Sequence, residues 1–434
     1  MKTRLNVMMF LEYAVKGIWI LQASAFLTIA AADGGLGFSE DQKGYIVAFP
    51  LAIGAILCPF IGQLCDRRFD TAKCLGVLLF FTGILKVITA EQTDFTAWLI
   101  LGTAFAILYS PSVSLTNSLA MRHLPNPKVE FPRVRLWGTI GWIAVAWGFP
   151  ALWLKQDLQF SWMPPFYTGA DRADVVPRMI DSLTAAGIIA MAYGIFCWFL
   201  LPKTPPVTSA AKRFVLSDAF GLLKKRSFAV LMIAAFVISM IHTFYFIQMS
   251  PFFIQAGLAK SSLLPALSIG QFSEIAVMAF LGFFLTRFGF RWCIAFGALC
   301  YALRYFIFAM TDLPLWVFVS AQAIHGLCFG FFFAASFVYV DRIAPKEIRH
   351  SAQTLLTLVI FGLGPLASAW FNGVLANYSG TVDGKLTMEG YATFWAVAGV
   401  IALVAAIAFA VFFRDEIPEE ENEARNSPKT ATDS

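Results

Sequence analysis

Long apolar stretches recur from one end of the chain to the other, with short polar segments between them. A helix of about 20 residues crosses a hydrocarbon core of about 30 Å, so each stretch is long enough to span a bilayer. Backbone groups in hydrocarbon must bond within their own segment, and the stretches therefore predict α-helices. We expect twelve membrane-spanning helices, at 7–32, 44–64, 73–90, 95–121, 134–155, 178–201, 227–256, 262–285, 291–310, 314–341, 349–376 and 390–413.

The composition agrees with an all-α protein solvated by a lipid bilayer. Of the 434 residues, 59% are hydrophobic and 14% are charged, and the mean hydropathy is +0.71. Soluble domains carry about 45–50% apolar and about 25% charged residues. The first helix contains Glu12 and Lys16 where a cleaved signal peptide would be purely apolar. We therefore expect this helix to be retained.

Lys and Arg predict the orientation. With both termini in the cytoplasm, the outer loops hold only Lys43, Lys155, Arg172, Arg178, Lys260 and Lys385. Lys16, Lys86 and Arg304 fall within helices, and the other 23 of the 32 lie on the cytoplasmic side. This asymmetry is typical of a multi-pass protein, here expected in the inner membrane. It accounts for the net charge of +5 without a nucleic-acid partner.

A polar, basic stretch at 202–226 divides the chain nearly in half. It predicts two six-helix bundles, 1–201 and 227–413, joined by a cytoplasmic linker and followed by an acidic, disordered tail at 414–434. A short repeat supports this division and consists of Gly62, Asp66 and Arg67 in the first half and Gly282 and Arg287 in the second. We expect the glycines to permit close helix approach and the arginines to cap helix ends. Parallel halves around a central site are the major facilitator architecture, whose loop signature this Gly-x-x-x-Asp-Arg element resembles.

Polar side chains at membrane depth are the candidates for function, because they are costly there. Gln271 and Glu274 lie three residues apart on the eighth helix, so both can face a central cavity. A carboxylate in that position could take up a proton, and Glu274 is the proposed proton-coupling residue. The alternative is a Glu paired permanently with an Arg as a structural element.

Arg135, Thr139 and Trp142 share one face of the fifth helix, and could hold a polar ligand that carries a ring. Arg135 could instead anchor the cytoplasmic interface, with Trp142 as packing. Further candidates whose roles stay open between ligand binding and helix packing are Asn117, Thr243, Tyr245, His325 and Phe329. Glu12 and Lys16, four residues apart, could pair, either structurally or as part of proton coupling.

Other chemistry is missing from the sequence. It has no Gly-x-x-x-x-Gly-Lys loop for ATP, no His-Glu-x-x-His or Cys-x-x-Cys metal site and no nucleophile elbow. We therefore expect a transporter rather than an enzyme, with no metal and no cofactor. We expect its partners to be a small solute, a proton and the lipid bilayer, and the protein to be a monomer.

Several motifs resemble the nucleoside–proton symporter family of the major facilitator superfamily. They are Phe131-Pro-Arg-Val-Arg135-Leu-Trp-Gly-Thr139-Ile-Gly, Tyr109-Ser-Pro-Ser through Asn117, Gln271-Phe-Ser-Glu274, Ala344 through Gln353 and Phe10 through Trp19. The resemblance implies proton-driven symport of nucleosides by alternating access. It implies substrate contacts from Arg135, Thr139, Trp142, Gln271, Glu274 and Phe329, with His325 where an aromatic Tyr can occur.

The chain departs from the family pattern at Gly330, Thr243 and Phe246, and at the charged Glu12 and Lys16. Polar partners are lost at the first three positions, so substrate discrimination is expected to differ. Two alternatives to nucleoside symport stay open at this point. One is transport of a sugar, a cell-wall fragment or another hydroxylated metabolite, and the other is a non-transporting receptor on a transporter scaffold.

Overall fold

α-Helices make up nearly all of the regular structure. The computed structural model describes residues 1–162, 166–206, 220–345 and 348–416, so most of the expected tail and the middle of the expected linker lie outside it. The first part contains α1 (Lys2–Gly17), α2 (Ile20–Thr28), α3 (Glu40–Arg68), α4 (Thr71–Ala90), α5 (Phe95–His123), α6 (Pro127–Phe149) and α7 (Val175–Leu200). The second contains α9 (Arg226–Gln255), α10 (Leu263–Ala309), α11 (Leu315–Ser320), α12 (Ile324–Cys328), α13 (Ala335–Ile343), α14 (Arg349–Leu358), α15 (Gly364–Ser379) and α16 (Met388–Phe412).

Short π-helical turns, two small hairpins and the 3-10 turns Ala31–Asp33, Gly221–Lys224, Lys260–Ser262 and Ala321–Ala323 connect or extend these helices. The π-helical turns extend α6 over Pro150–Leu154, join α12 to α13 over Phe329–Ala334, and join α14 to α15 over Val359–Leu363. β1 (Gln159–Phe160) pairs antiparallel with β2 (Tyr167–Thr168), and β3 (Thr381–Val382) with β4 (Lys385–Leu386).

Ten helical stretches in the described residues are long and apolar enough to cross a membrane. The longest, Lys260–Ala309, has 50 residues and is interrupted at Gly289, where φ is 75° and ψ is 168°. Only glycine adopts that conformation readily, which explains why the helix is interrupted at this residue. The interruption lies between the expected helices 262–285 and 291–310. The expected helix at 7–32 differs more, because it is divided at Ile18–Trp19 into α1 and α2.

Side-chain caps explain why some helices begin earlier than hydropathy predicts. Ser39 and Gln42 form a capping box, in which Ser39 Oγ accepts from Gln42 N at 3.3 Å and Gln42 Oε1 accepts from Ser39 N at 3.1 Å. α3 therefore begins at Glu40 rather than at 44. Asp70 likewise accepts from the backbone of Lys73 at 3.1 Å and starts α4.

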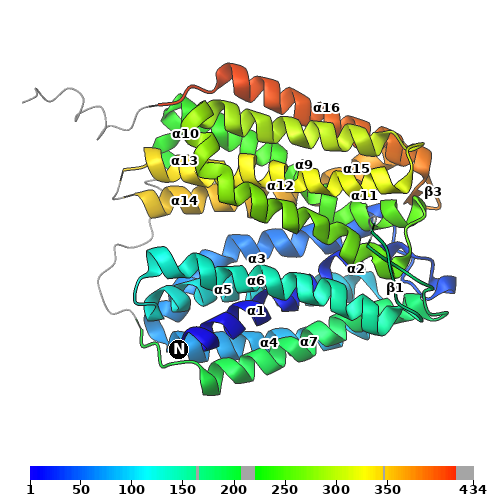
Figure 1. Cartoon of the computed structure of the whole chain (residues 1–434), viewed down its shortest axis with the longest axis horizontal. Helices are drawn as coiled ribbons and strands as arrows, with labels where there is room; N and C mark the ends of the chain where they lie inside the picture. The colour runs from blue at the N-terminus through cyan, green and yellow to red at the C-terminus, as the bar shows by residue number, and fades with distance from the viewer. Residues whose placement is uncertain (163–165, 207–219, 346–347, 417–434) are drawn as a thin grey trace, which may run out of the picture.

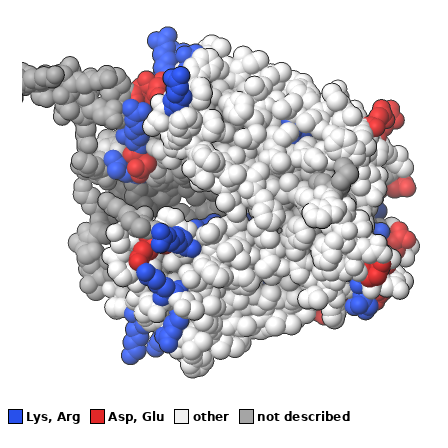
Figure 2. All heavy atoms as spheres, viewed as in Figure 1, with Lys and Arg blue, Asp and Glu red and all other residues white. Residues whose placement is uncertain are grey.

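Figure 1 shows the helices α1–α7 lying side by side in one layer and α9–α16 in a second layer above it. The N-terminus and the α3–α4 turn lie at one end, and both hairpins lie at the other. In Figure 2 most Lys and Arg gather at the first end, around a hollow between the layers. We call these the basic end and the hairpin end.

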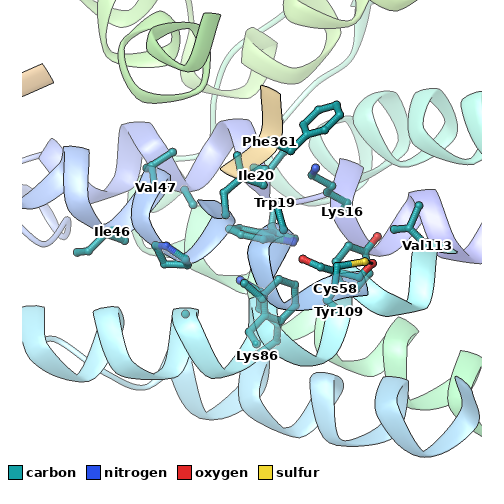
Figure 3. Close-up of a pocket in the computed structure, with 18 of the residues that line it drawn as sticks. Lys16, Trp19, Ile20, Ile46, Val47, Cys58, Lys86, Tyr109, Val113 and Phe361 are labelled. Atoms are coloured by element: carbon teal, nitrogen blue, oxygen red, sulfur yellow. Dashed lines mark hydrogen bonds between the residues drawn. The ribbon is translucent and has the colours of Figure 1, made fainter. Parts of the chain in front are cut away.

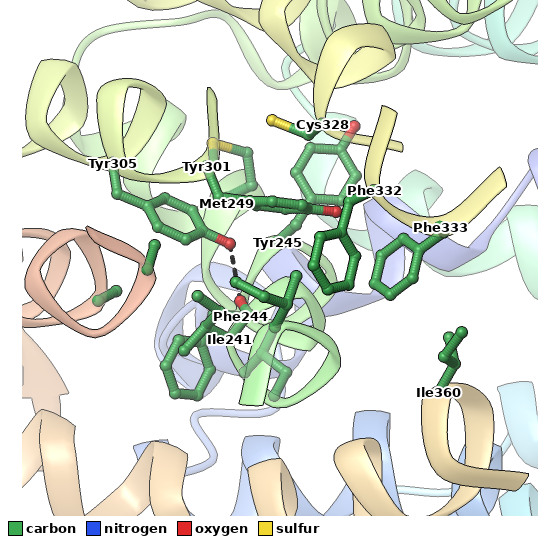
Figure 4. Close-up of a cluster of buried hydrophobic side chains, with 14 of the residues drawn as sticks. Ile241, Phe244, Tyr245, Met249, Tyr301, Tyr305, Cys328, Phe332, Phe333 and Ile360 are labelled. Atoms are coloured by element: carbon green, nitrogen blue, oxygen red, sulfur yellow. Dashed lines mark hydrogen bonds between the residues drawn. The ribbon is translucent and has the colours of Figure 1, made fainter. Parts of the chain in front are cut away.

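Apolar packing joins the two layers at the hairpin end. The larger buried cluster contains residues of α2 and the start of α3, such as Leu27 and Ile46, together with the apolar interior of α9–α16. Figure 4 shows part of it, where Tyr305 donates to the Ile241 carbonyl oxygen at 2.7 Å. The smaller cluster, which includes Leu79 and Leu115, stays within α1–α7.

Two glycine pairs hold α4 against α7. Gly76 faces Gly194, and Gly83 faces Gly187, seven residues along each helix. A Cβ atom on Gly76 would lie 2.9 Å from the Gly194 carbonyl oxygen, so the helices approach backbone to backbone. Large apolar side chains on the outside of the layers remain exposed, as lipid-facing residues do.

Candidate functional site

Glu274 lies on α10, a helix of the second layer that contacts α6 of the first. It is half-buried and interacts electrostatically with Arg135 on α6, although the two do not form an ion pair. The Arg135 guanidinium lies 3.9 Å from the centre of the Tyr13 ring on α1. No residue in the described part of the chain donates a hydrogen bond to the Glu274 carboxylate. This carboxylate is therefore positioned between the layers with its acceptor capacity free.

The neighbouring candidates on these helices have different surroundings. With its amide turned so that the nitrogen faces the backbone, Gln271 donates to the carbonyl oxygens of Leu267 and Ser268, both at 3.2 Å. Trp142 packs on α1, since a Cβ atom on Gly17 would lie 2.9 Å from its Cδ2 atom. Thr139, one turn after Arg135, is half-buried.

His325 belongs to a buried network that also contains Arg304. The guanidinium of Arg304 donates to His325 Nδ1 at 3.0 Å and to Gln322 Oε1 at 2.6 Å. Because Arg has no acceptor, His325 Nδ1 carries no proton here. The His325 ring also stacks on Tyr245, with centroids 4.8 Å apart. Sequence reasoning placed Arg304 within a helix and did not predict this contact.

The remaining candidates are mainly packed or bonded within the protein. The Thr243 hydroxyl donates to the Ser239 carbonyl oxygen of its own helix at 2.9 Å. Phe329 packs against Phe333, with ring centroids 5.8 Å apart. Asn117, in contrast, has a buried side-chain oxygen without a hydrogen-bond partner.

Glu12 is fully buried, and α5 supplies its partners. Ser112 Oγ donates to Oε1 at 2.7 Å and Thr116 Oγ1 donates to Oε2 at 3.0 Å. The expected pair between Glu12 and Lys16 is not formed. Lys16 instead lines a cavity, within electrostatic range of Glu12.

That cavity, of about 440 Å³, lies among α1–α5 and is covered by Thr357 and Phe361 of the second layer (Figure 3). The Lys86 ammonium, on α4, projects into it beside Trp19. Its nitrogen lies 3.0 Å from the centre of the Trp19 ring and 4.0 Å from that of Phe105. The described lining residues include Lys16 and Lys86 but no Asp or Glu.

Lys86 is a buried cation without a carboxylate partner among the described residues. A cation–π contact contributes about 2 kcal/mol when it is desolvated. Burying an ion costs several kcal/mol, so the rings offset only part of that cost. A lysine in an apolar run is a functional candidate by its depth alone, and this signal could have identified Lys86 from the sequence.

A buried polar network closes the hairpin end. Lys43 forms an ion pair with Glu40 at 2.8 Å and donates to Gln248 Oε1 on α9 at 2.8 Å. Gln248 donates in turn to Glu40 at 2.5 Å and to Asn372 on α15 at 2.8 Å. Tyr391 on α16 donates to Gln248 at 3.1 Å. The start of α3 is therefore bonded to α9, and through Gln248 of α9 it is linked to α15 and α16.

The repeated loop motif gives a different result from the one expected. Nothing lies within 4 Å of where a Cβ atom would be on Gly62 or Gly282, so neither glycine mediates close helix approach in this conformation. Arg287 is exposed at the basic end. Arg67 lies in the last turn of α3 there, and the Asp66 side chain lies outside the described part.

Comparisons with known proteins agree along almost the whole chain. A family model described as "Nucleoside H+ symporter" matches residues 1–417. The putative nucleoside transporter YegT of Escherichia coli K12 is 33% identical over 96% of this chain and 95% of its own. The xanthosine permease of the same organism is 26% identical over 96% and 97%.

Solved structures share the fold. The crystal structure of the nucleoside transporter NupG superposes with a TM-score of 0.80 at 20% identity, covering 96% of this chain and 99% of the other. A bacterial homologue of the human lysosomal transporter Spinster, in an inward-facing and unoccupied conformation, gives a TM-score of 0.71 at 15% identity over 95% and 96%.

Proposed function

The chain belongs to the nucleoside H+ symporter family, and from that premise we propose that Glu274 and Arg135 form the centre of its transport site. Membership makes it a proton-coupled transporter of nucleosides with the major facilitator fold, and not an enzyme. It also favours nucleosides over sugars or cell-wall fragments, and transport over a receptor role.

Twelve membrane crossings fit the described helices. The 50-residue stretch Lys260–Ala309 would be about 75 Å long at 1.5 Å per residue, more than twice the hydrocarbon thickness of about 30 Å, and it is interrupted at Gly289. This stretch therefore forms two crossings, which raises the ten candidate spans to eleven crossings. α1 and α2, which are not among the ten spans, together form the twelfth. Six crossings then precede the linker at 202–226 and six follow it.

The charge distribution supports an orientation with the basic end in the cytoplasm, as the positive-inside rule requires. Both termini would then be cytoplasmic, and the hairpins would lie on the opposite, outer side of the inner membrane. The lipid bilayer is the solvent for the exposed apolar belt, and one chain contains all the proposed site residues, as a monomer needs.

Alternating access is supported by the difference between the two ends. Hydrogen bonds between the layers gather toward the hairpin end, where Ser24 donates to the Ile247 carbonyl oxygen at 2.5 Å and Trp147 donates to Ser268 at 2.8 Å. At the basic end a hollow separates the layers in Figure 2. We assign this conformation as inward-facing, with the substrate entering or leaving from the cytoplasm.

Glu274 is the proposed proton carrier because its carboxylate is half-buried and accepts no hydrogen bond from a residue that the structure describes. Charged, it opposes closure of the layers around it, since desolvating a carboxylate is costly. Protonation removes that charge and lets the layers close over the substrate. Gln271, Thr139 and Trp142 would contact the nucleoside, and Phe329 would stack on its base. His325, Tyr245 and Thr243 would support the cavity wall.

The position of Glu274 beside Arg135, between the two layers, is the observation that carries this proposal. Uptake of labelled uridine and adenosine by proteoliposomes, with and without an inward proton gradient, tests it. We expect uptake stimulated by the gradient and abolished by a protonophore. Folded protein that takes up neither nucleoside under any gradient would overturn the proposal.

A further inference from the structure

The cavity in the first layer contains two lysines and no acid among its described lining residues. Lys86 is 2% exposed, and its ammonium lies on the Trp19 and Phe105 rings. Lys16 lines the same cavity, and so do Thr357 and Phe361 of the second layer, so the cavity lies at the boundary between the layers. The two lysines are therefore the basic side chains that this wall offers to an anion, and Lys16 also lies within electrostatic range of Glu12.

We propose that this cavity binds an anionic group of the transported solute, so that the substrate is a nucleoside carrying a carboxylate or phosphate. This inference rests on the proposed function and specifies its substrate class. Lys86 and Lys16 would donate charge-assisted hydrogen bonds to the anion. Arg135, Gln271 and Glu274 would hold the remainder of the nucleoside.

The shape and chemistry of the cavity fit such a ligand. Its volume of about 440 Å³ lies within the range of about 300–1,000 Å³ that is typical of small-molecule sites. Trp19, Phe105 and Tyr109 provide aromatic surface. The side-chain oxygen of Asn117 is buried without a partner and can accept a hydrogen bond from a ribose hydroxyl or a base nitrogen if the side chain turns.

Two other lysines show what is particular to Lys86. Lys43 is equally buried, but Glu40 neutralises it at 2.8 Å. Lys73, on the same helix as Lys86, also lies over an aromatic ring, that of Trp198 at 5.4 Å, but it is exposed at the basic end. Burial, aromatic contact and lack of a carboxylate partner combine at Lys86, and an anionic substrate would supply that carboxylate.

Competition in proteoliposomes tests the proposal. Uptake of labelled uridine is measured against unlabelled uridine, uridine 6-carboxylate and uridine 5′-monophosphate, which place the anion on the base or on the ribose. We expect at least one anionic competitor to inhibit about 10-fold more strongly than uridine, the advantage of about one charge-assisted contact. The position of the anion in the stronger competitor identifies its source.

Variants locate the effect. In Lys86→Met the advantage of the anionic competitor should fall to about 1-fold, and Lys86→Arg should restore most of it. Lys16→Met should reduce it in part. Lys73→Met is the matched control, because Lys73 is on the same helix as Lys86 and also lies over an aromatic ring, but outside the cavity. This variant should retain the full preference for the anionic competitor.

A second measurement does not depend on the variants folding. The thermal midpoint of the parent protein should rise more with the anionic nucleoside than with uridine at equal concentration, because tighter ligands stabilise more. Equal shifts together with equal competition would overturn the anion site and leave nucleoside transport intact. Absence of uptake and of thermal shift with all three compounds would instead contradict the proposed function itself.

Discussion

Two carboxylates lie at membrane depth, Glu12 in the first layer and Glu274 in the second. Glu12 is fully buried and accepts hydrogen bonds from Ser112 and Thr116. Glu274 is half-buried, has no hydrogen-bond donor in the described part of the chain, and faces Arg135 across the boundary between the layers. The same residue type therefore occupies a closed structural position in one layer and an accessible position in the other.

The difference in hydrogen bonding indicates which of the two carboxylates can exchange protons during transport. A carboxylate whose oxygens are held by neighbouring hydroxyls cannot exchange protons without disrupting α1–α5 packing. A carboxylate that faces the space between the layers can do so each time that space meets water. Glu12, proposed alongside Glu274 for proton coupling, is better explained as a structural link, and four substitutions test this comparison.

Glu274→Gln should have the largest effect. A gradient of about 2 pH units can sustain roughly 100-fold accumulation for one proton per substrate. We expect the variant to lose that accumulation, with an inside-to-outside ratio of about 1, while exchange of labelled for unlabelled nucleoside continues, because the amide mimics the protonated acid. Accumulation in Glu274→Gln equal to that of the parent would move the proton site elsewhere.

Arg135→Ala should follow. Hydrogen bonds to charged groups contribute about 1.5–3 kcal/mol, so we expect nucleoside affinity to fall about 10- to 100-fold. Binding measured by isothermal titration checks this, with Arg133→Ala, an exposed arginine on the same helix, as the matched control. Unchanged affinity would instead assign Arg135 to anchoring α1 through the Tyr13 ring.

Glu12→Leu should affect stability more than coupling. Ser112 would keep the Tyr109 carbonyl oxygen at 2.7 Å as acceptor, and Thr116 would keep the Tyr193 hydroxyl at 3.0 Å. The cost is therefore that of two lost hydrogen bonds, about 1–3 kcal/mol in all. We expect a lower midpoint of thermal unfolding, with the proton-driven accumulation ratio unchanged in protein that remains folded. Glu12→Gln, which keeps an acceptor, should lie between the parent and Glu12→Leu. Loss of accumulation at an unchanged midpoint would contradict the structural assignment and return Glu12 to the proton pathway.

Thr243→Val should have the smallest effect. The Thr243 hydroxyl already donates to the Ser239 carbonyl oxygen within α9, and such bonds add little to a helix. We expect nucleoside affinity to change less than about 2-fold. A larger loss, measured by the same titration as for Arg135→Ala, would show that the hydroxyl leaves its helix to bind substrate.

Hydropathy predicted where most helices lie, because hydrocarbon leaves the backbone few alternatives. Local details could also be read from single residues, such as the break at Gly289 between two expected helices. The division of the first helix could not, because its cause is tertiary. Trp142 of α6 packs against Gly17 where α1 ends, and the sequence around Gly17 does not predict this contact.

The candidate site follows the same rule. Depth in the membrane identified Glu274, Arg135 and His325 as polar side chains that need partners. Their partners depend on which helices are neighbours, so the bond from Arg304 to His325 and the position of Lys86 on Trp19 appeared only in three dimensions. The roles of Arg135, Gln271 and Glu274 in binding stay predictions until they are measured.

The closed hairpin end has one more consequence. One turn of α3, with Glu40 and Lys43, bonds α9, α15 and the β3–β4 hairpin of the other layer. Displacing that turn would break these bonds together, so none can be released alone. Opening should therefore be cooperative, and single-molecule distance measurements across this end should show two discrete populations with few molecules between them.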